Sequence, residues 1–255
     1  NVPYEELIPL AHTVQSDRKL REDNETIRRE FTANVSHELK TPLTSISGYA
    51  ELIENGMAKQ EDIPTFGHRI HKEAQRMITL VSDILQLSEL DGMSKQQENS
   101  PTADFVPVDL GVLVKDVATN MTVNARKAYI TLQYKVQPVT VRGSHDLLTE
   151  LVTNLCDNAI KYNVDGGSVD VRVGAEGGSA CLTVRDTGIG IPPEHQSRIF
   201  ERFYRVDKSH SKASGGTGLG LSIVKHAVAY HHGTIALKSE VGKGTEITVR
   251  FPQEK

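Results

Sequence analysis

Cysteine is nearly absent from this sequence, in which only Cys156 and Cys181 occur among 255 residues. Neither belongs to a Cys-x-x-C pair or lies in a cluster of histidines and cysteines, so the sequence shows no ligand set for a structural zinc ion. Two isolated cysteines do not indicate a disulfide framework either. We therefore expect a reduced domain without a structural metal, as is typical of intracellular proteins.

Long apolar runs and an excess of positive charge are missing as well. No segment approaches the roughly 18 apolar residues that a membrane-spanning helix needs, and no signal peptide is visible. The formal net charge of -4 gives no electrostatic reason to expect nucleic acid or an anionic membrane as a partner. Because the sequence opens on Asn1 and not on methionine, we expect a fragment, with any membrane segment upstream of it.

Glycine is scarce before residue 109, where only four of the 20 glycines fall, and this divides the chain into two parts. In the first part, apolar residues recur at steps of mostly three, four or seven, which predicts a helix from roughly Ser16 to Glu54. A turn follows at Asn55-Gly56, and Asp62 is a good N-cap for a second helix with Pro64 in its first turn. Two helices cannot bury both apolar stripes alone, so we predict a dimeric four-helix bundle.

The second part of the chain alternates between strand and helix patterns after a polar linker at residues 91–104. Asp109 and Ser144 are predicted N-caps. The predicted strands are 105–108, 129–136, 139–142, 168–174, 180–185, 234–239 and 245–251, and the predicted helices are 109–126, 144–162, 194–203 and 219–230. This mixture predicts an α/β sandwich, in which helices cover a mixed sheet.

One histidine of the first helix, His37, is set apart from the apolar stripe. At about 100° per residue it lies about 200° from both Val35 and Leu39, so it points away from the helix seam. Glu38 places a carboxylate beside it. Pro42 lacks the N–H that would bond the Glu38 carbonyl, so we expect the helix to be weakened or bent one turn later. A solvated surface histidine is the ordinary interpretation, and four downstream clusters argue against it.

The first cluster is a row of polar side chains on the helix predicted at 144–162. Glu150, Asn154, Asn158 and Lys161 are spaced by four, four and three residues, so they share one face, with Tyr162 next to them. Carboxamide oxygens suit a hard cation such as Mg²⁺. Lys161 can reach a phosphate as a point charge.

The second cluster is Asp186-x-Gly188-x-Gly190, directly after a predicted apolar strand. A carboxylate at a strand end can accept a hydrogen bond from an exocyclic amine, and the glycines let a ligand approach the backbone. By itself this pattern is more often an ordinary turn.

The third and fourth clusters complete the pattern. The third is the aromatic run Phe200-Glu-Arg-Phe-Tyr-Arg205, which could pin a loop. The fourth is the run Gly216-Thr217-Gly218-Leu219-Gly220, which opens a predicted helix. Its backbone amides and the helix N-terminus would form a cradle for a polyphosphate. No Gly-Lys-Ser/Thr follows, so this is not a Walker A loop.

In this order, the clusters resemble those of bacterial two-component sensor histidine kinases, over nearly everything from about Glu30 to Phe251. Within that family the chain is similar to the phosphate-sensor and cell-wall-sensor kinases. Residues 37–43 match the H box, 154–162 the N box, 186–190 the G1 box, 200–203 the F box and 216–220 the G2 box. The resemblance implies a signalling helix at 1–29, a dimerisation and histidine-phosphotransfer domain at 30–92, a linker at 93–104 and a Bergerat-type (GHKL) ATP-binding domain at 105–255.

The resemblance also implies roles for individual residues. His37 would accept the phosphoryl group, Glu38 would act as base, and the Thr41 hydroxyl would orient a water for phosphatase activity. Asn154, with Glu150, would ligate Mg²⁺, and Asp186 would recognise the adenine amine. The residues implied in ATP binding are Asn154, Asn158, Lys161, Tyr162, Asp186, Gly188, Gly190, Phe200, Arg205, Gly216, Thr217, Gly218, Leu219 and Gly220.

The implied partners are a second copy of the chain, through the helical bundle, and the receiver domain of a response regulator. The implied location is the cytoplasmic portion of a bacterial plasma-membrane protein, with no nucleic acid partner. Arg205, Lys208 and Lys212 all remain candidates for the lid cation that meets the γ-phosphate. His210, His231 and His232 are interpreted as surface or lid residues.

Three other functions stay open on the sequence alone. The first is a phosphatase-dominant core. The second is an ATP-driven clamp like the gyrase and heat-shock chaperone ATPases, which share the nucleotide fold but lack a His-Glu helix bundle. The third is a non-catalytic dimerisation scaffold.

Overall fold

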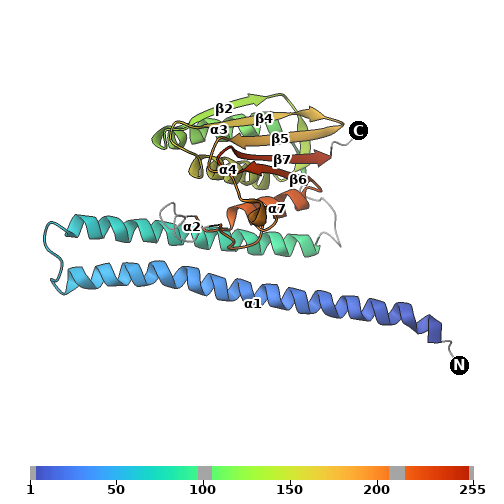
Figure 1. Cartoon of the computed structure of the whole chain (residues 1–255), viewed down its shortest axis with the longest axis horizontal. Helices are drawn as coiled ribbons and strands as arrows, with labels where there is room; N and C mark the ends of the chain where they lie inside the picture. Colours follow the sequence, from blue (N-terminus) through green and yellow to red (C-terminus); the bar gives the residue numbers. More distant parts are fainter. Residues whose placement is uncertain (1–3, 97–104, 207–215, 253–255) are drawn as a thin grey trace. The chain divides into compact units, whose positions relative to one another are not determined.

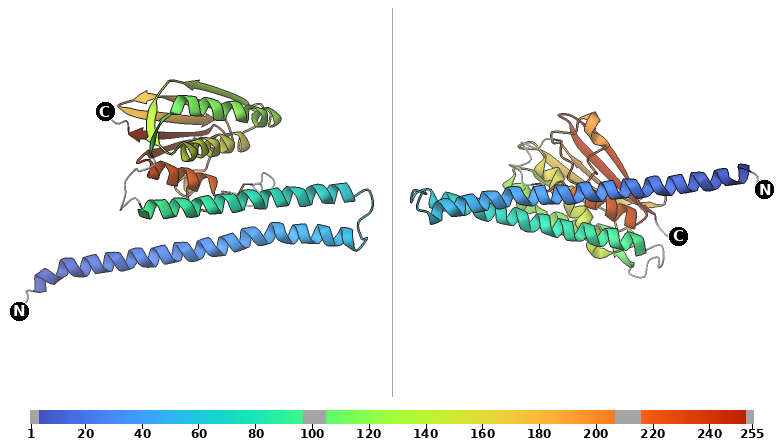
Figure 2. Two further views of the ribbon diagram at one scale, coloured as in Figure 1. Left: turned by 180° about the vertical axis from the view of Figure 1, so that it is seen from behind. Right: turned by 90° about the horizontal axis from the view of Figure 1, so that it is seen from below.

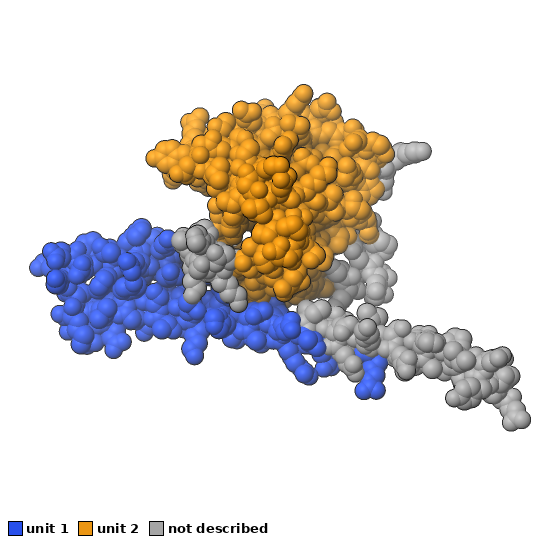
Figure 3. Space-filling view, in the orientation of Figure 1, with its two compact units in different colours: residues 1–78 blue, residues 79–255 orange. Residues whose placement is uncertain are grey.

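The computed structural model describes residues 4–96, 105–206 and 216–252. The chain divides into two compact units, residues 1–78 and residues 79–255 (Figure 3). The division falls inside the second helix, and the predicted domain boundaries stay predictions.

The first unit is built on a helical hairpin. Helix α1 (Tyr4–Glu54) begins earlier than predicted and continues through Pro42, and helix α2 (Ile63–Gln96) begins directly after Asp62 (Figures 1 and 2). Gly56 has a φ of 64° in the turn between them, a conformation that glycine adopts without strain. The predicted linker starts too early, because α2 extends to Gln96.

Side chains near the turn tie the two helices of this unit together. The rings of Tyr49 and Phe66 lie 5.1 Å apart, and the Arg69 guanidinium lies 5.4 Å from the Tyr49 ring centre. Arg69 also donates a hydrogen bond to the Tyr49 hydroxyl. Three apolar residues of α1 are incompletely buried: Phe31 and Val35 are half-buried, and Leu43 is 56% exposed. One hairpin therefore leaves apolar surface uncovered.

The second unit contains a five-stranded mixed sheet. Its order is β2-β4-β5-β7-β6, with β2 and β4 parallel and the other pairs antiparallel. Strands β1 and β3 form a separate antiparallel pair. The strands are β1 (Val106–Asp109), β2 (Thr131–Val136), β3 (Thr140–Gly143), β4 (Ser168–Glu176), β5 (Ser179–Asp186), β6 (Thr234–Glu240) and β7 (Gly244–Pro252).

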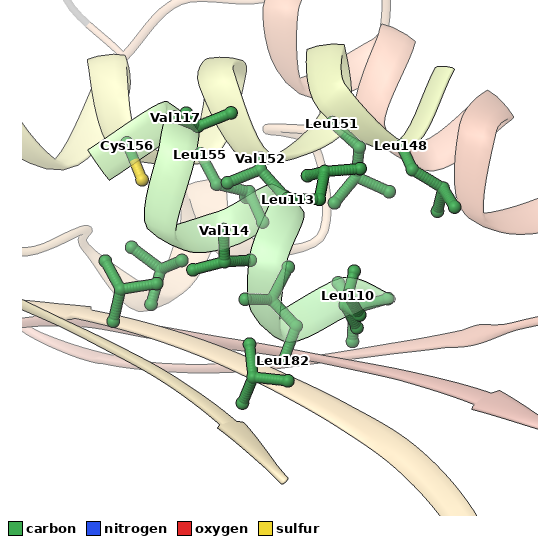
Figure 4. Packing of buried hydrophobic residues seen from close by; sticks show 14 of the residues in the cluster. Leu110, Leu113, Val114, Val117, Leu148, Leu151, Val152, Leu155, Cys156 and Leu182 are labelled. Atoms are coloured by element: carbon green, nitrogen blue, oxygen red, sulfur yellow. The ribbon is translucent and has the colours of Figure 1, made fainter. Parts of the chain in front are cut away.

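Helices α3 (Leu110–Lys127), α4 (His145–Lys161) and α7 (Gly220–Tyr230) cover one face of this sheet (Figures 1 and 2). Asp109 caps α3 by accepting from the amides of Gly111 and Val112, and Ser144 caps α4. Leucine and valine side chains of α3 and α4 interlock with those of the sheet, as Figure 4 shows for Leu110, Val114, Leu151, Val152 and Leu182. The predicted α/β sandwich is confirmed.

The helix predicted at residues 194–203 is wrong in its extent. Helix α5 covers only Pro193–Gln196, and turns follow to Phe203. Phe203 has a φ of 61°, which a helix cannot accommodate, and its N–H donates to the carbonyl of Gly218 instead of a helical partner. The chain at Phe203 is therefore not helical and is bonded to a distant segment.

His231 was predicted at the surface or in the lid, and the structure corrects this. Its side chain is 4% exposed, Nε2 accepts from the Ser144 amide at 3.0 Å and Nδ1 donates to the Ala227 carbonyl at 2.7 Å. Burial lowers the pKa of this imidazole. His231 thus connects the ends of α7 and α4. His232 is exposed as predicted, and His210 lies outside the described residues.

Candidate functional site

A cavity of about 450 Å³ opens in the second unit between α4, the loop after β5, the loop before α7 and residues of α2. This volume lies in the usual range for small-molecule sites. The predicted site residues that line it are Asn154, Asn158, Lys161, Tyr162, Asp186, Gly190, Arg205, Gly216, Thr217, Gly218 and Gly220. Glu150, Gly188, Phe200 and Leu219 lie outside this lining, and Leu219 is fully buried.

The polar face of α4 lies against the glycine loop, which we define as residues 216–220. A Cβ built on Gly220 would lie 2.8 Å from Asn154 Oδ1, and one on Gly216 would lie 2.8 Å from Lys161 Nζ. Side chains at these two positions would therefore displace the amide oxygen and the ammonium group. Of the predicted polar row, Asn154, Asn158 and Lys161 form one wall of the cavity, and Glu150 lies outside its lining.

The glycine loop leads directly into α7. The N-cap position of α7, Leu219, makes no side-chain capping hydrogen bond, and its backbone N–H reaches Thr217 Oγ1 at 3.3 Å. The first amides of a helix are unpaired donors at the positive end of the helix dipole. With Lys161 beside the loop, this end of the cavity suits a polyphosphate.

Asp186 lies at the end of β5, with one carboxylate oxygen fixed by the backbone. Its Oδ1 accepts from the Gly188 amide at 2.8 Å and from the Thr245 amide at 3.1 Å. Among the described residues Oδ2 has no such partner, so it can accept from a ligand. Burial raises the pKa of this carboxyl, and the two amide hydrogen bonds counteract that rise.

The loop after β5 needs glycine at two positions. Gly190 has a φ of 69°, and a Cβ there would lie 2.0 Å from the Glu240 carbonyl oxygen. A Cβ on Gly188 would lie 2.2 Å from the Tyr162 carbonyl oxygen, which also accepts from the Ile189 amide. The glycines therefore let this loop pack against the end of α4 and against β6.

Two residues of the aromatic run after α5 line another side of the cavity. The Tyr204 hydroxyl and His195 Nδ1 are 2.6 Å apart, and the Arg198 guanidinium lies 4.3 Å from the Tyr204 ring centre. Tyr204 and Arg205 line the cavity, while Phe200 is half-buried outside it. The predicted pinning role thus belongs to Tyr204. Lys208 and Lys212 lie outside the described residues.

Sequence reasoning missed several lining residues. Thr245 supplies an amide to Asp186, because the antiparallel register of β5 and β7 places its strand start beside the end of β5. Asp83 and Thr79 enter from α2, four residues apart on one helical face. The Gly-Lys-Gly-Thr turn before β7 was the only local signal for Thr245, and neither α2 residue carries one.

Glu150 lies one turn before Asn154 in a setting that disfavours its charge. Burial and the negative charge of Asp83 raise the pKa of Glu150 to about 7. A folded-state pKa above the unfolded value of 4.5 means that the folded protein holds the proton more tightly. Folding stability from this group is therefore present below pH 4.5 and is lost as the pH rises through about 7.

We expect Glu150→Gln to stabilise the protein at pH 8 by about 1 kcal/mol, after allowance for solvent screening, and to change little at pH 4.5. Glutamine cannot ionise, so the variant keeps the folding stability that the wild type loses when Glu150 ionises. Thermal unfolding at both pH values measures the difference, with the exposed Glu194→Gln as matched control. A destabilised Glu150→Gln at pH 8 would mean that a favourable contact holds the ionised carboxylate.

In the first unit, His37 is exposed, as its helical position predicts. Glu38 forms an ion pair with Arg76 of α2 at 3.2 Å, and Arg76 is only 13% exposed. Glu38 accepts this contact through Oε2. The Thr41 hydroxyl donates to the His37 carbonyl at 3.3 Å, so its oxygen is held one turn beyond His37.

Comparison with known families matches both parts of the chain. The family described as "Histidine kinase-, DNA gyrase B-, and HSP90-like ATPase" matches residues 143–255. The family described as "His Kinase A (phospho-acceptor) domain" matches residues 27–92. The first match covers the cavity lining except Thr79 and Asp83, and the second covers these two residues and His37.

Curated relatives align along most of the chain. It is 38% identical over 230 residues to the sensor-like histidine kinase SenX3 of Mycolicibacterium smegmatis, which covers 90% of the chain and 58% of SenX3. It is 36% identical over 250 residues to the sensor protein kinase WalK of Staphylococcus aureus, covering 97% of the chain and 58% of that protein. The chain thus spans little more than half the length of these relatives.

Solved structures agree with the fold. The mycobacterial sensor histidine kinase MprB is 33% identical, with 58% of this chain and 97% of that chain covered and a TM-score of 0.50. Histidine kinase ThkA in complex with the response regulator protein TrrA matches 95% of this chain and 66% of its own, with a TM-score of 0.71 and 22% identity. Among the described residues, no helix is both long and apolar enough to cross a lipid bilayer.

Proposed function

Because this chain belongs to the family of two-component sensor histidine kinases, we propose that it transfers the γ-phosphoryl group of ATP to His37 and then to an aspartate of a response regulator. The observation that carries the proposal is the pairing of Asp186 and the glycine loop in one cavity, in a chain whose α1 exposes a histidine beside a carboxylate. Neither the clamp nor the scaffold explains that exposed histidine.

ATP binding would use both ends of the cavity. Asp186 Oδ2 would accept from the exocyclic amine of adenine, while the amides of the glycine loop and Lys161 would hold the phosphates. The side-chain oxygen of Asn154, next to Gly220, suits Mg²⁺, which takes few protein ligands and completes its shell with water and phosphate. When bound, Mg²⁺ would supply charge neutralisation on the phosphates. Glu150 is the second candidate ligand.

Phosphoryl transfer would use the exposed imidazole as nucleophile. One imidazole nitrogen of His37 attacks the γ-phosphorus, the bond to the bridging oxygen breaks, and ADP leaves with that electron pair. Glu38 would hold the proton on the other nitrogen, which makes the attacking nitrogen more nucleophilic. The ion pair with Arg76 supports this assignment, because it fixes the carboxylate beside the helix.

Dimerisation would cover the apolar surface that one hairpin leaves exposed. Among the side chains of the first unit that the structure describes, the exposed large apolar ones are Leu43, Leu52, Met57, Ile63 and Ile78. Exposed apolar side chains are costly in water, and burying them in an interface removes that cost. A four-helix bundle of two chains would bury these side chains. Sedimentation of the purified chain over a concentration series tests this state.

The proposals of a response-regulator partner and of membrane anchoring rest on related proteins. A response regulator is bound in the ThkA structure, which supports a receiver domain as phosphoryl acceptor here. Membrane anchoring through segments outside this sequence, in the manner of sensor kinases, would place the chain on the cytoplasmic side of a bacterial plasma membrane.

Labelling with γ-³²P ATP and Mg²⁺ tests the proposed kinase. We expect protein-bound label that is stable in base and lost in acid, as a phosphohistidine is. Release of free phosphate without labelled protein would support the ATP-driven clamp instead. No turnover and no ATP binding would support the scaffold.

A phosphatase activity is the second candidate function, and the fixed Thr41 hydroxyl favours it. Its oxygen lies one turn beyond His37, where it could accept a hydrogen bond from a water that attacks the regulator's aspartyl phosphate. The same hydroxyl does not belong to the nucleotide cavity.

Thr41→Ala is therefore expected to lower dephosphorylation of a phosphorylated regulator by roughly tenfold or more, and to leave autophosphorylation intact. The nucleophile, Glu38 and the cavity keep their structure in this variant. Thr44→Ala is the matched control, because Thr44 makes the same helical hydrogen bond, to the Lys40 carbonyl. Equal loss of both activities in Thr41→Ala would refute a role of the Thr41 hydroxyl in dephosphorylation alone.

A further inference from the structure

The second unit contains a carboxylate from α2 inside the cavity that the function above does not use. Asp83 Oδ2 accepts a hydrogen bond from the Thr217 hydroxyl at 2.6 Å. Thr217 is the central polar residue of the glycine loop and is 9% exposed. Both residues line the cavity, so the contact lies where the phosphates would bind.

Asp83 lies among charged groups in the region of the cavity where phosphates would bind. Burial raises the pKa of Asp83, and the hydrogen bond from Thr217 opposes this rise. The negative charge of Asp157 adds to the rise, and the positive charge of Lys161 opposes it. Lys161 is also the cation beside Gly216. Asp83 therefore uses the same hydroxyl and the same positive charge that a bound phosphate would need.

We propose that Asp83 occupies the phosphate subsite in the nucleotide-free protein and competes with the phosphates of ATP for Thr217 and Lys161. The inference rests on the proposed function, since it assumes that the cavity binds ATP. Its consequence is a coupling between the cavity and α2. A nucleotide that takes the Thr217 hydroxyl releases Asp83, and a carboxylate left beside the phosphates favours nucleotide whose charge is neutralised by Mg²⁺.

The Asp83→Asn variant removes the negative charge and keeps the size and shape of the side chain. Asparagine keeps an oxygen that can accept from Thr217 but removes the negative charge. We expect the purified 255-residue variant to bind ADP in the absence of divalent cations roughly tenfold more tightly than the wild type. The gain should be smaller with Mg²⁺, because the metal ion already screens the phosphates. Adenosine, which has no phosphate, should bind both proteins equally.

Isothermal titration with ADP in chelator, ADP with Mg²⁺, and adenosine measures these constants. Glu89→Gln is the matched control, because it removes the same charge from an exposed position on α2 and should change none of them. An unchanged ADP affinity in Asp83→Asn would overturn the competition. Weaker binding only with Mg²⁺ would also overturn it, since Asp83 would then be a metal ligand. A wild type that binds no nucleotide would refute the proposed function itself.

Discussion

Replacing His37 with glutamine is expected to abolish labelling by γ-³²P ATP, to on the order of a thousandth of the wild-type level or less, and to leave ATP affinity unchanged. Glutamine has a similar polar reach but no nitrogen lone pair that can attack phosphorus. His37 is not among the residues that line the cavity.

Quantifying acid-labile label on equal amounts of folded wild type and variant decides the assignment. His68→Gln is a suitable control, because His68 is an exposed histidine in the same unit without an adjacent carboxylate. We expect its label to equal that of the wild type. Label persisting in His37→Gln would assign the phosphoacceptor to another residue.

The elements with local signals could be predicted from the sequence. Asp109 and Ser144 cap α3 and α4 as predicted, because a short polar side chain satisfies the first amides of a helix wherever it occurs. The polar face of α4 and the strands of the sheet followed from periodicity alone. These are properties of neighbouring residues, so no tertiary contact was needed.

The predictions that were wrong concern residues whose positions depend on contacts between distant segments. Phe203, at the end of the helix predicted at 194–203, is not helical and bonds to Gly218. The buried His231 accepts a hydrogen bond from the Ser144 amide. Each contact joins residues far apart in the sequence. Nothing beside Phe203 or His231 in the sequence marks these contacts. They depend on the tertiary fold.

The candidate site shows the same difference between residues with a local sequence signal and residues placed by tertiary contacts. Asp186 and the glycine loop carry their own pattern and lie in the cavity where predicted. Thr245 and Asp83 were missed, because strand register brings the first to Asp186 and helix α2 brings the second to Thr217. Motif reasoning thus predicted most of the polar and glycine residues that line the cavity, but not the residues that contact them from β7 and α2.

Asp186→Asn is expected to weaken adenine nucleotide binding by roughly 1–3 kcal/mol or more, as for the loss of a charge-assisted hydrogen bond. The backbone contacts decide how the asparagine sits. Its oxygen should keep the hydrogen bonds from the Gly188 and Thr245 amides, since both need an acceptor. Its amide nitrogen then replaces Oδ2, so a donor faces the exocyclic amine of adenine, which is also a donor.

The same geometry predicts a change in base preference. Guanine presents an acceptor oxygen where adenine presents its amine, so the wild-type carboxylate repels guanine while the asparagine amide can donate to it. Binding constants of ADP and GDP for both proteins test this: the ratio in favour of ADP should fall sharply in the variant, with an unchanged melting temperature as evidence of an intact fold. Asp165→Asn, at an exposed turn outside the cavity, is the control and should keep the wild-type ratio. Equal ADP affinity in wild type and Asp186→Asn would mean that this carboxylate does not recognise the base.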